Sequence, residues 1–434
     1  MKVRIGAVAI LVMLLGASPA RGQGTLTLKE SYEKALARSE TVAIQEETIR
    51  IAEAHYLQAL GTVLPHVNVI GTEIIQDTGG GGAGGTGGAS VGDTLTRRSR
   101  PEVAVQLVQP LFQGFREFRA LKAANAEKRQ NKLLTERARQ TLFSDVAQAY
   151  YTVLEVERQR DIQNSLRDTL GKRTGELKER IRLGKSRGSE LLTTEAEIAN
   201  VEADLEQTKG LIATSRDYLA FLIGEPVTQK LVDEFKTPAK LPPVTAYIDA
   251  LTSRPDIGAS QQSIRIAQGR LDYQKGGRYP TLDFVGNYYP YRVGFLKDID
   301  WDLTFTLNIP IFQGGATRGL IREAAAQLDQ AKLSDSLTAR QAEMDVRRAY
   351  DNLKYSRSQE AALRRAESKS GQSFQAQQDE YRLGLVNNLD VLVSLRSWQQ
   401  QRLETNLAYF TTKLNYLNVL VASGDLPPKL QASE

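Results

Sequence analysis

Apolar residues recur with two different periods along this chain of 434 residues. Between positions 115 and 182 there is no proline, charged residues occur throughout, and apolar residues keep a heptad spacing. A seam that repeats every 3.5 residues predicts helices that pack as a coiled coil. At 1.5 Å per residue such a helix is roughly 100 Å long, and its charges predict that it lies in water. The seam consists of Leu142, Val146, Ala149, Val153 and Val156.

The heptad pattern returns in two later stretches, each of which follows a glycine. Together with the proline-free stretches before them, they predict two long helical hairpins, over residues 115–224 and 315–424. The first returning seam consists of Ile198, Val201, Leu205, Thr208, Ile212, Ser215, Leu219 and Leu222, and the second of Leu403, Leu407, Phe410, Leu414, Leu417 and Val421.

Other stretches alternate apolar and polar residues with a period of two. The pattern is clearest in residues 300–309, weaker in 103–107, and present again in 282–288. About ten residues of this period match a tilted transmembrane strand, although a half-buried sheet of a soluble protein alternates in the same way. Aromatic residues gather near both ends of the predicted strands, as in two interfacial girdles: Tyr288, Tyr291 and Trp301 at one end, and Tyr279, Phe112 and Phe312 at the other.

The chain is an internal duplication, because its motifs recur at a long offset. The segment 49–52, Ile-Arg-Ile-Ala, returns at 264–267, an offset of 215. After a glycine-rich insertion in the first half, the offset becomes 200: residues 110–114 match 310–314, and 182–184 match 382–384. We therefore expect two repeats, 21–236 and 237–434, each with a helix, a strand pair (63–112 and 280–312) and a long helical hairpin.

Four strands are too few for one chain to close a membrane barrel, since the smallest common barrels have eight. An open sheet edge in lipid would leave unpaired N–H and C=O groups, each costing several kcal/mol. If these strands span a membrane, other copies must close the sheet. Two copies would give about eight strands and a filled interior, whereas three would give about twelve and leave a lumen.

The beginning of the chain has the pattern of a secretory signal peptide over residues 1–20. Lys2 and Arg4 precede an apolar run from Ile5 to Leu15, which is too short to span a bilayer, and small residues follow. The formal charge is +5, with acidic and basic residues interspersed. That mixture predicts a solvated surface and no nucleic-acid partner.

The sequence shows no clear pattern of catalytic or metal-binding residues. There are no cysteines, and the two histidines, His55 and His66, have no second ligand nearby. The glycine tract from Gly79 to Gly88 lacks the lysine of a phosphate-binding loop, so we interpret it as a flexible loop between strands. By barrel convention the long loops face outward, which would put it at the cell surface. We therefore expect neither an enzyme nor a bound cofactor or metal.

The duplicated strand ends and glycine-marked hairpin tips resemble those of the TolC-like outer-membrane efflux protein family. The resemblance covers nearly the whole chain after residue 20 and rests on Pro-Leu-Phe-Gln-Gly at 110–114, Pro-Ile-Phe-Gln-Gly at 310–314, and Arg-Leu-Gly at 182–184 and 382–384. It implies a membrane α+β fold. Each internally duplicated chain would give four transmembrane β-strands to a trimeric 12-stranded barrel, continued by a long coiled-coil α-helical periplasmic barrel.

The same resemblance implies an outer-membrane exit duct with a large periplasmic part. Such a duct serves a tripartite efflux pump or a type I secretion system, in contact with outer-membrane lipid, a periplasmic adaptor (membrane fusion) protein and an inner-membrane transporter. It would be a homotrimer and a passive conduit opened by its partners. A periplasmic coiled-coil adaptor or structural protein without a pore is the alternative, although it would not be expected to carry duplicated strand pairs.

Two groups of candidate residues lie at the predicted hairpin tips. The resemblance implies that the exposed tips dock the adaptor, through Arg182, Leu183, Gly184, Arg382, Leu383 and Gly384. Glu190 and Asp390 each lie six residues after a tip glycine, where three copies would form two acidic rings that attract cations. Acids near a helix N-terminus are also favoured by the helix dipole, so a capping role is equally open. Well-known relatives have further charged residues where this chain has Val386 and Val393, which implies a less charged constriction here.

Overall fold

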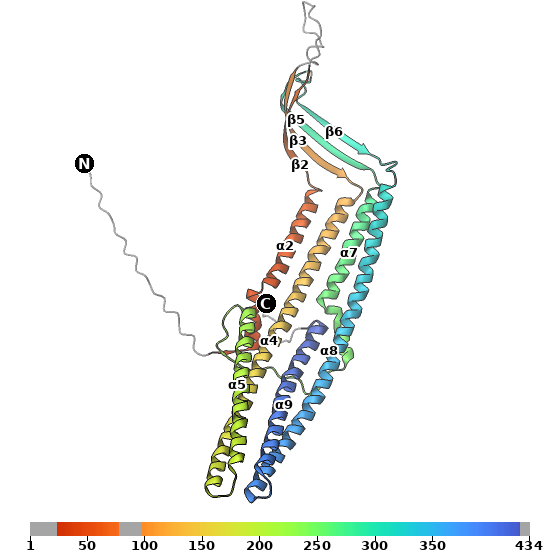
Figure 1. The fold of residues 1–434 in the computed structure, drawn as a ribbon. Helices are drawn as coiled ribbons and strands as arrows, with labels where there is room; N and C mark the ends of the chain where they lie inside the picture. Colours follow the sequence, from red (N-terminus) through yellow and green to blue (C-terminus); the bar gives the residue numbers. More distant parts are fainter. Residues whose placement is uncertain (1–23, 78–97, 295, 426–434) are drawn as a thin grey trace, which may run out of the picture.

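The computed structural model describes residues 24–77, 98–294 and 296–425 and is mostly helical, at 71%. A slender helical body carries a small sheet at one end and two hairpin tips at the other (Figure 1). In chain order the elements are β1 (Thr25–Leu26), α1 (Leu28–Arg38), α2 (Glu40–Gly61), β2 (His66–Ile75), β3 (Ser99–Phe112), α4 (Arg116–Arg182), α5 (Gly188–Ile223), β4 (Lys230–Leu231), α6 (Val244–Asp249), the 3-10 helix η1 (Ala250–Ser253), α7 (Pro255–Gly276), β5 (Thr281–Arg292), β6 (Trp301–Asn308), α8 (Ala316–Leu383) and α9 (Asn388–Ser423).

Two very long helices span the helical body, as the heptad pattern predicts. The helices α4 and α8 have 67 and 68 residues, and their return helices α5 and α9 have 36 each. Toward the sheet, α2 packs on α4 and α7 packs between α4 and α8; toward the tips, α5 packs on α4 and α9 on α8 (Figure 1). None of the described helices contains an apolar stretch that is long enough and sufficiently free of charged residues to cross a membrane.

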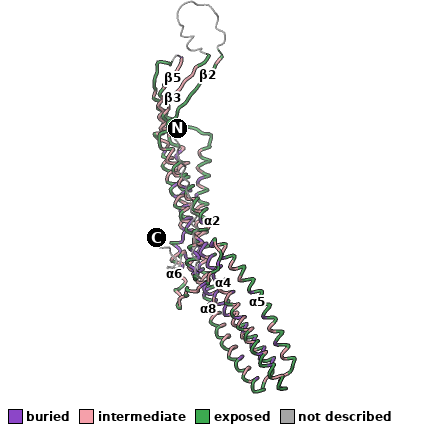
Figure 2. The backbone as a smooth tube through the Cα atoms, turned by 90° about the vertical axis from the view of Figure 1, so that its left-hand side faces the viewer, coloured by how far each residue is buried: buried purple, intermediate pink, exposed green. Residues whose placement is uncertain are grey.

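The largest core lies at the middle of the helical body, where buried residues concentrate (Figure 2). Of the first predicted seam, Val146 and Val153 are fully buried, and the other members are nearly so. The prediction for Leu407 is wrong, since that side chain is 56% exposed. Asn406 is buried beside it, and its side-chain amide donates to the Glu155 carbonyl at 2.9 Å.

The sheet at the end of the body is antiparallel, with strand order β2-β3-β5-β6. The hairpins β2–β3 and β5–β6, one from each half of the chain, meet where β3 pairs with β5. Within the described residues, β2 and β6 are the two edges of this sheet. Its open edges are therefore the first strand of one half and the second strand of the other.

The two faces of the sheet differ in polarity. Along β6, Trp301, Leu303, Phe305 and Leu307 lie on one face and are each more than half exposed. A row of polar side chains crosses three strands on the opposite face, where Gln106 donates to Asn287 at 3.1 Å and Asn287 to Asp302 at 2.9 Å. Among the described elements no helix packs closely on this sheet, so its apolar face is exposed.

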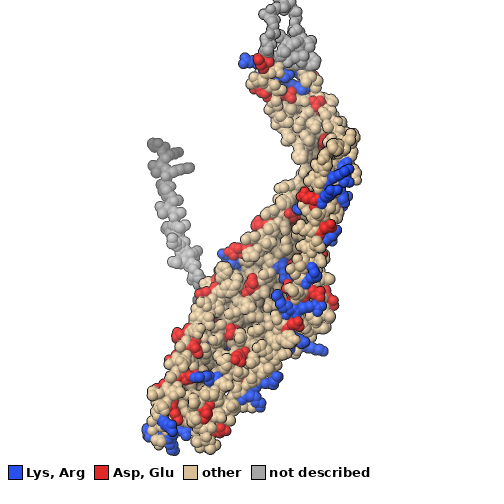
Figure 3. Space-filling model, turned by 45° about the vertical axis from the view of Figure 1, so that its right-hand side comes forward, with Lys and Arg blue, Asp and Glu red and all other residues tan. Residues whose placement is uncertain are grey.

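Two features expected from the sequence lie outside the described residues. They are the signal peptide over residues 1–20 and the loop containing the glycine tract from 79 to 88. Acidic and basic side chains are interspersed over the helical part of the surface. They are sparse over most of the sheet and reappear at the end of the sheet that lies farthest from the helices (Figure 3).

Candidate functional site

The two hairpin tips have the same backbone geometry, built around glycine. Gly184 and Gly384 follow α4 and α8 with φ of 69° and 79°, in the left-handed region that favours glycine. The N–H of Lys185 donates to the Arg180 carbonyl at 2.8 Å, and that of Leu385 to the Glu380 carbonyl at 2.9 Å. This is a Schellman ending, which satisfies the last carbonyls of each helix and turns the chain back.

Each tip presents apolar side chains to solvent. Leu183 is 58% exposed and Leu383 is 76% exposed. The neighbouring arginines are held by their own helices, Arg182 by Glu179 at 3.0 Å and Arg382 by Asp379 at 3.3 Å. Such exposed ion pairs contribute little to stability, so both arginines can exchange partners at low cost. The tips thus combine accessible leucines with accessible positive charge.

The two acids that the sequence placed at equivalent positions have different surroundings. Asp390 is exposed and closes a capping box with Asn387, accepting from its N–H at 3.2 Å. Glu190 is half-buried, and its Oε2 accepts from the Ser186 hydroxyl at 2.6 Å and the Tyr381 hydroxyl at 3.3 Å. Asp390 therefore takes the capping role, whereas Glu190 connects the two hairpins.

Glu190 belongs to a cluster that joins the hairpins near their tips, which we name the tip latch. From the first hairpin it takes two arginines of α4 and two residues of α5, and from the second a tyrosine of α8 and an asparagine of α9. Asn388 is buried and its amide donates to the Thr194 hydroxyl at 3.2 Å and the Glu190 carbonyl at 3.3 Å. The tip latch consists of Arg173, Arg180, Glu190, Thr194, Tyr381 and Asn388.

Both arginines of the latch lie over the ring of Tyr381. The guanidinium carbons of Arg173 and Arg180 are 3.7 Å and 4.5 Å from its centroid, within cation–π range. Arg173 is only 5% exposed, and its Nε donates to the Asn388 side chain at 2.9 Å. Burial lowers the pKa of Arg173, and the nearby Tyr381 and Glu176 oppose that shift. An arginine stays charged at physiological pH, so this is a buried cation that an aromatic ring and the Glu176 carboxylate, 3.3 Å from its Nη1, hold together.

Of the six latch residues, only Glu190 was predicted from the sequence as a site residue. Three of the others differ in chemical type from the residue at the equivalent position of the other repeat. At an offset of 200, Arg173 corresponds to Ser373, Tyr381 to Ile181 and Asn388 to Gly188. These three departures are a sequence signal for the latch, whereas Thr194 has the similar Ser394 at its repeat position and carries no such signal.

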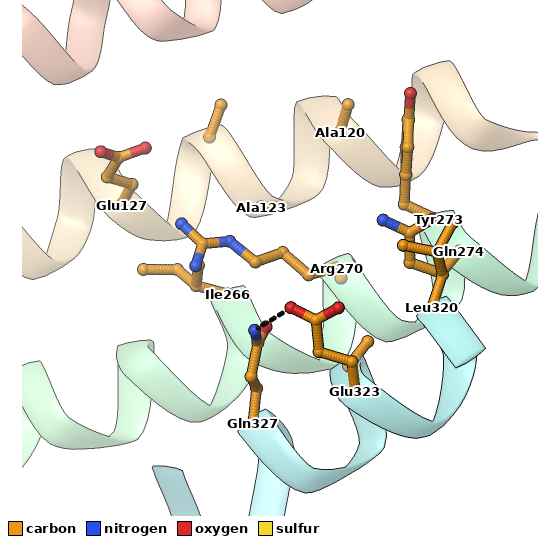
Figure 4. A pocket seen from close by; sticks show the side chains of 13 residues that line it. Ala120, Ala123, Glu127, Ile266, Arg270, Tyr273, Gln274, Leu320, Glu323 and Gln327 are labelled. Carbon is orange, nitrogen blue, oxygen red and sulfur yellow. Dashed lines mark hydrogen bonds between the residues drawn. The ribbon is translucent and has the colours of Figure 1, made fainter. Parts of the chain in front are cut away.

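A groove of about 320 Å³ lies between α4, α7 and α8 near the sheet (Figure 4). Arg270 extends along it, and Gln327 donates to Glu323 at 3.2 Å on its α8 wall. The rest of the lining is largely alanine and aliphatic, with Glu127 on the α4 wall. Among the described residues there is no group of three His, Asp or Glu side chains that could hold a metal ion.

Comparison with known proteins gives one family and one fold. The family model described as outer membrane efflux protein matches residues 31–225 and 246–422. The outer membrane efflux protein BepC of Brucella suis is 25% identical over 308 residues, which are 68% of this chain and 66% of BepC. The chain thus matches slightly less than two thirds of the length of that relative.

Solved structures share the fold at low identity. CusC, described in the context of transmembrane channel formation, superposes with a TM-score of 0.78 at 17% identity, over 92% of both chains. The outer membrane protein VceC of Vibrio cholerae gives a TM-score of 0.77 at 17% identity, over 92% of this chain and 96% of VceC. At these identities the likeness concerns the arrangement of helices and strands.

Proposed function

The chain belongs to the outer membrane efflux protein family, and from this membership we propose that it is the exit duct of a tripartite efflux pump or a type I secretion system. Its place is the outer membrane, and its family is one of channel proteins. The observation that carries the proposal is the sheet, which is apolar and uncovered on one face and polar on the other. Lipid would cover the apolar face, and the polar face would line a water-filled passage.

The sheet supports a homotrimer. Two unpaired strand edges in lipid would each expose a row of backbone groups at several kcal/mol per group. Pairing the edges of three copies gives a closed barrel of about twelve strands with room for a lumen. The long helices would continue this barrel into the periplasm.

We predict that the protein extracted in detergent is a trimer in native mass spectrometry. The reason is that edge pairing between copies is the remaining way to satisfy the strands in lipid. The same preparation should form water-filled pores in planar bilayers. A stable monomer embedded in the outer membrane, or protein that leaves the membrane without detergent, would favour the alternative of an adaptor or structural protein without a pore.

The hairpin tips support contact with a periplasmic adaptor. Leu183 and Leu383 are exposed at the end of the body farthest from the sheet, together with two exchangeable arginines. With the sheet in the outer membrane, the tips would reach toward the inner membrane. The described residues contain no apparent site for nucleotide chemistry, so energy would come from an inner-membrane transporter, and this chain would be a passive conduit.

The acids near the tips support a cation-selective entrance. In a trimer, Asp390 and Glu190 would each occur once per subunit around the narrow end, and rings of carboxylates attract cations. We predict that Asp390→Ala with Glu190→Ala lowers cation selectivity and weakens block by multivalent cations added from the tip side. Single-channel recording measures both.

One single substitution separates the charge of Asp390 from its capping role. Asp390→Asn keeps an acceptor for the capping box and removes the charge, so it should lower selectivity while leaving the helix intact. Selectivity and block that stay unchanged in the double variant would exclude both residues from the entrance and leave Asp390 only its capping function.

A further inference from the structure

The two halves of the chain repeat each other down to the pairing of individual strand residues. In the first hairpin His66 pairs with Val108, and in the second Thr281 pairs with Asn308. Adding 215 to the first position and 200 to the second converts one pair into the other. The conversion holds for every pair recorded between β5 and β6, as far as the pair Tyr288 with Trp301. The repeat is therefore a reliable map from one half onto the other.

The same offsets can be applied to the pairing that joins the two halves, and the equivalent pairing is one that a single chain does not contain. At that junction β3 of the first half pairs with β5 of the second, with Gln106 opposite Asn287. Mapped forward, β3 becomes β6 and β5 becomes β2, and these are the two open edges of the described sheet. A single chain cannot bring these edges together across its own sheet, so the mapped junction lies between two copies.

The end of β6 shows what is missing there. In the first half, β3 continues to Phe112, because its last residues pair with β5. In the second half, β6 stops at Asn308, and the equivalent residues Ile311 and Phe312 are 93% and 87% exposed. The two segments, 110–114 and 310–314, have nearly the same sequence, but within the described chain only 110–114 has a neighbouring strand to pair with.

Glycines beneath the sheet give a second, independent sign of the same junction. Gly114 and Gly276 pack together inside the chain: a Cβ atom added at Gly276 would lie 2.8 Å from the Gly114 carbonyl oxygen, closer than real contacts allow. Their repeat equivalents are Gly314 and Gly61. Nothing lies within 4 Å of a Cβ at either of these two positions. Gly314 has a φ of 59°, which favours glycine by itself. Gly61 has no positive φ, so neither the backbone nor the packing of the single chain accounts for glycine there.

We propose that copies of this chain join by repeating its internal junction. In that contact Gly314 packs against Gly61 of the partner subunit, and Thr306 of β6 lies opposite the partner's Thr72. The proposal rests on the homotrimer put forward above and adds the residues and the register that hold it together. Each copy offers one such edge on each side, so the contacts close into a ring.

Cysteine pairs test the register, and the chain has no cysteines to interfere. The double variant Thr306→Cys, Thr72→Cys should form disulfide-linked chains under mild oxidation, seen as dimers and trimers in non-reducing gels. The matched control Thr306→Cys, Asn68→Cys should form none, because position 68 is about 13 Å further along the strand, too far for a disulfide. Native mass spectrometry of both variants reports whether the trimer is present. A trimer in which the control pair crosslinks instead would overturn the register and leave the duct standing.

A substitution at Gly61 tests the glycine contact. It lies at the end of α2 without positive φ and with open space around it, so Gly61→Leu should leave the isolated fold intact and its helix content unchanged. In the assembly the leucine would meet the partner's Gly314, and the trimer fraction should fall at least tenfold. The control is Gly171→Leu, also a helix glycine with nothing within 4 Å, on a helix already flanked by α5 and α9. Undiminished trimer in Gly61→Leu would refute the contact, whereas an absent trimer in the unmodified protein would instead refute the homotrimer.

Discussion

Transport should fall to the level of cells that lack the protein when Leu183 and Leu383 are both replaced by aspartate. Both side chains are mostly exposed at the tips, where an adaptor would cover them. Burying one unpaired carboxylate in such an interface costs several kcal/mol, and each subunit of a trimer would carry two. Since 1.4 kcal/mol corresponds to a tenfold change in affinity, docking should be lost. Survival or export assays in cells and co-purification of the adaptor after crosslinking measure the effect.

Conservative variants separate docking from folding. Leu183→Met with Leu383→Met keeps an apolar side chain of similar volume and should retain transport. The aspartate variant should still reach the outer membrane and form the trimer, because the turns depend on Gly184 and Gly384, and neither leucine is part of a buried core. Undiminished transport by the aspartate variant would show that the adaptor docks elsewhere.

The features predicted from sequence are those fixed by periodicity. The absence of proline, together with a heptad seam in the first half and the repeat in the second, identified α4 and α8 nearly to their ends. The alternation in residues 300–309 identified β6, and the glycines at 184 and 384 identified the turns. Counting strands then predicted open edges, because pairing is a property of the backbone and needs no knowledge of side-chain contacts.

Periodicity does not determine which polar groups meet. Arg173 lies within a helix of 67 residues that contains many other charged positions, and nothing local distinguishes it. Its burial arises because Tyr381 and Asn388, more than 200 positions later, cover it. Leu407 fails for a related reason: the heptad allowed it inside, but Asn406 and Ala408 occupy the interior instead. Both cases are decided by the packing of neighbouring helices.

The two ends of the molecule use the duplication in opposite ways. Beneath the sheet the glycines occur in both halves, so a junction inside the chain can be repeated between chains. At the tips, Ser373, Ile181 and Gly188 stand where the latch has Arg173, Tyr381 and Asn388. The latch therefore holds the two hairpins of one chain together and cannot be repeated between copies. In the proposed trimer we therefore expect the sheet end to be uniform around the ring and the tip end to be joined firmly only within each subunit.

It follows that loosening the latch should open the tip end of the duct. The Arg173→Met variant keeps much of the side-chain volume and removes the cation from the Tyr381 ring and the donor from Asn388. A desolvated cation–π contact contributes about 2 kcal/mol, which corresponds to a shift of roughly 30-fold in a closed-to-open equilibrium. Bilayer recordings of the purified trimer should therefore show a rise in open probability of about that size.

Three further variants separate the contributions of the hydroxyl, the charge and the position in the repeat. Tyr381→Phe keeps the ring that both arginines contact and removes only the hydroxyl that donates to Glu190, so its effect should be several-fold smaller than that of Arg173→Met. Arg173→Lys keeps the charge but loses the planar stacking, and should fall between these two variants. The matched control is Ser373→Met, at the equivalent and exposed position of the second hairpin, which should leave open probability unchanged. If Arg173→Met lowered the thermal stability of the trimer without any change in open probability, the latch would be a packing feature of the closed hairpins and the opening of the duct would depend on other contacts.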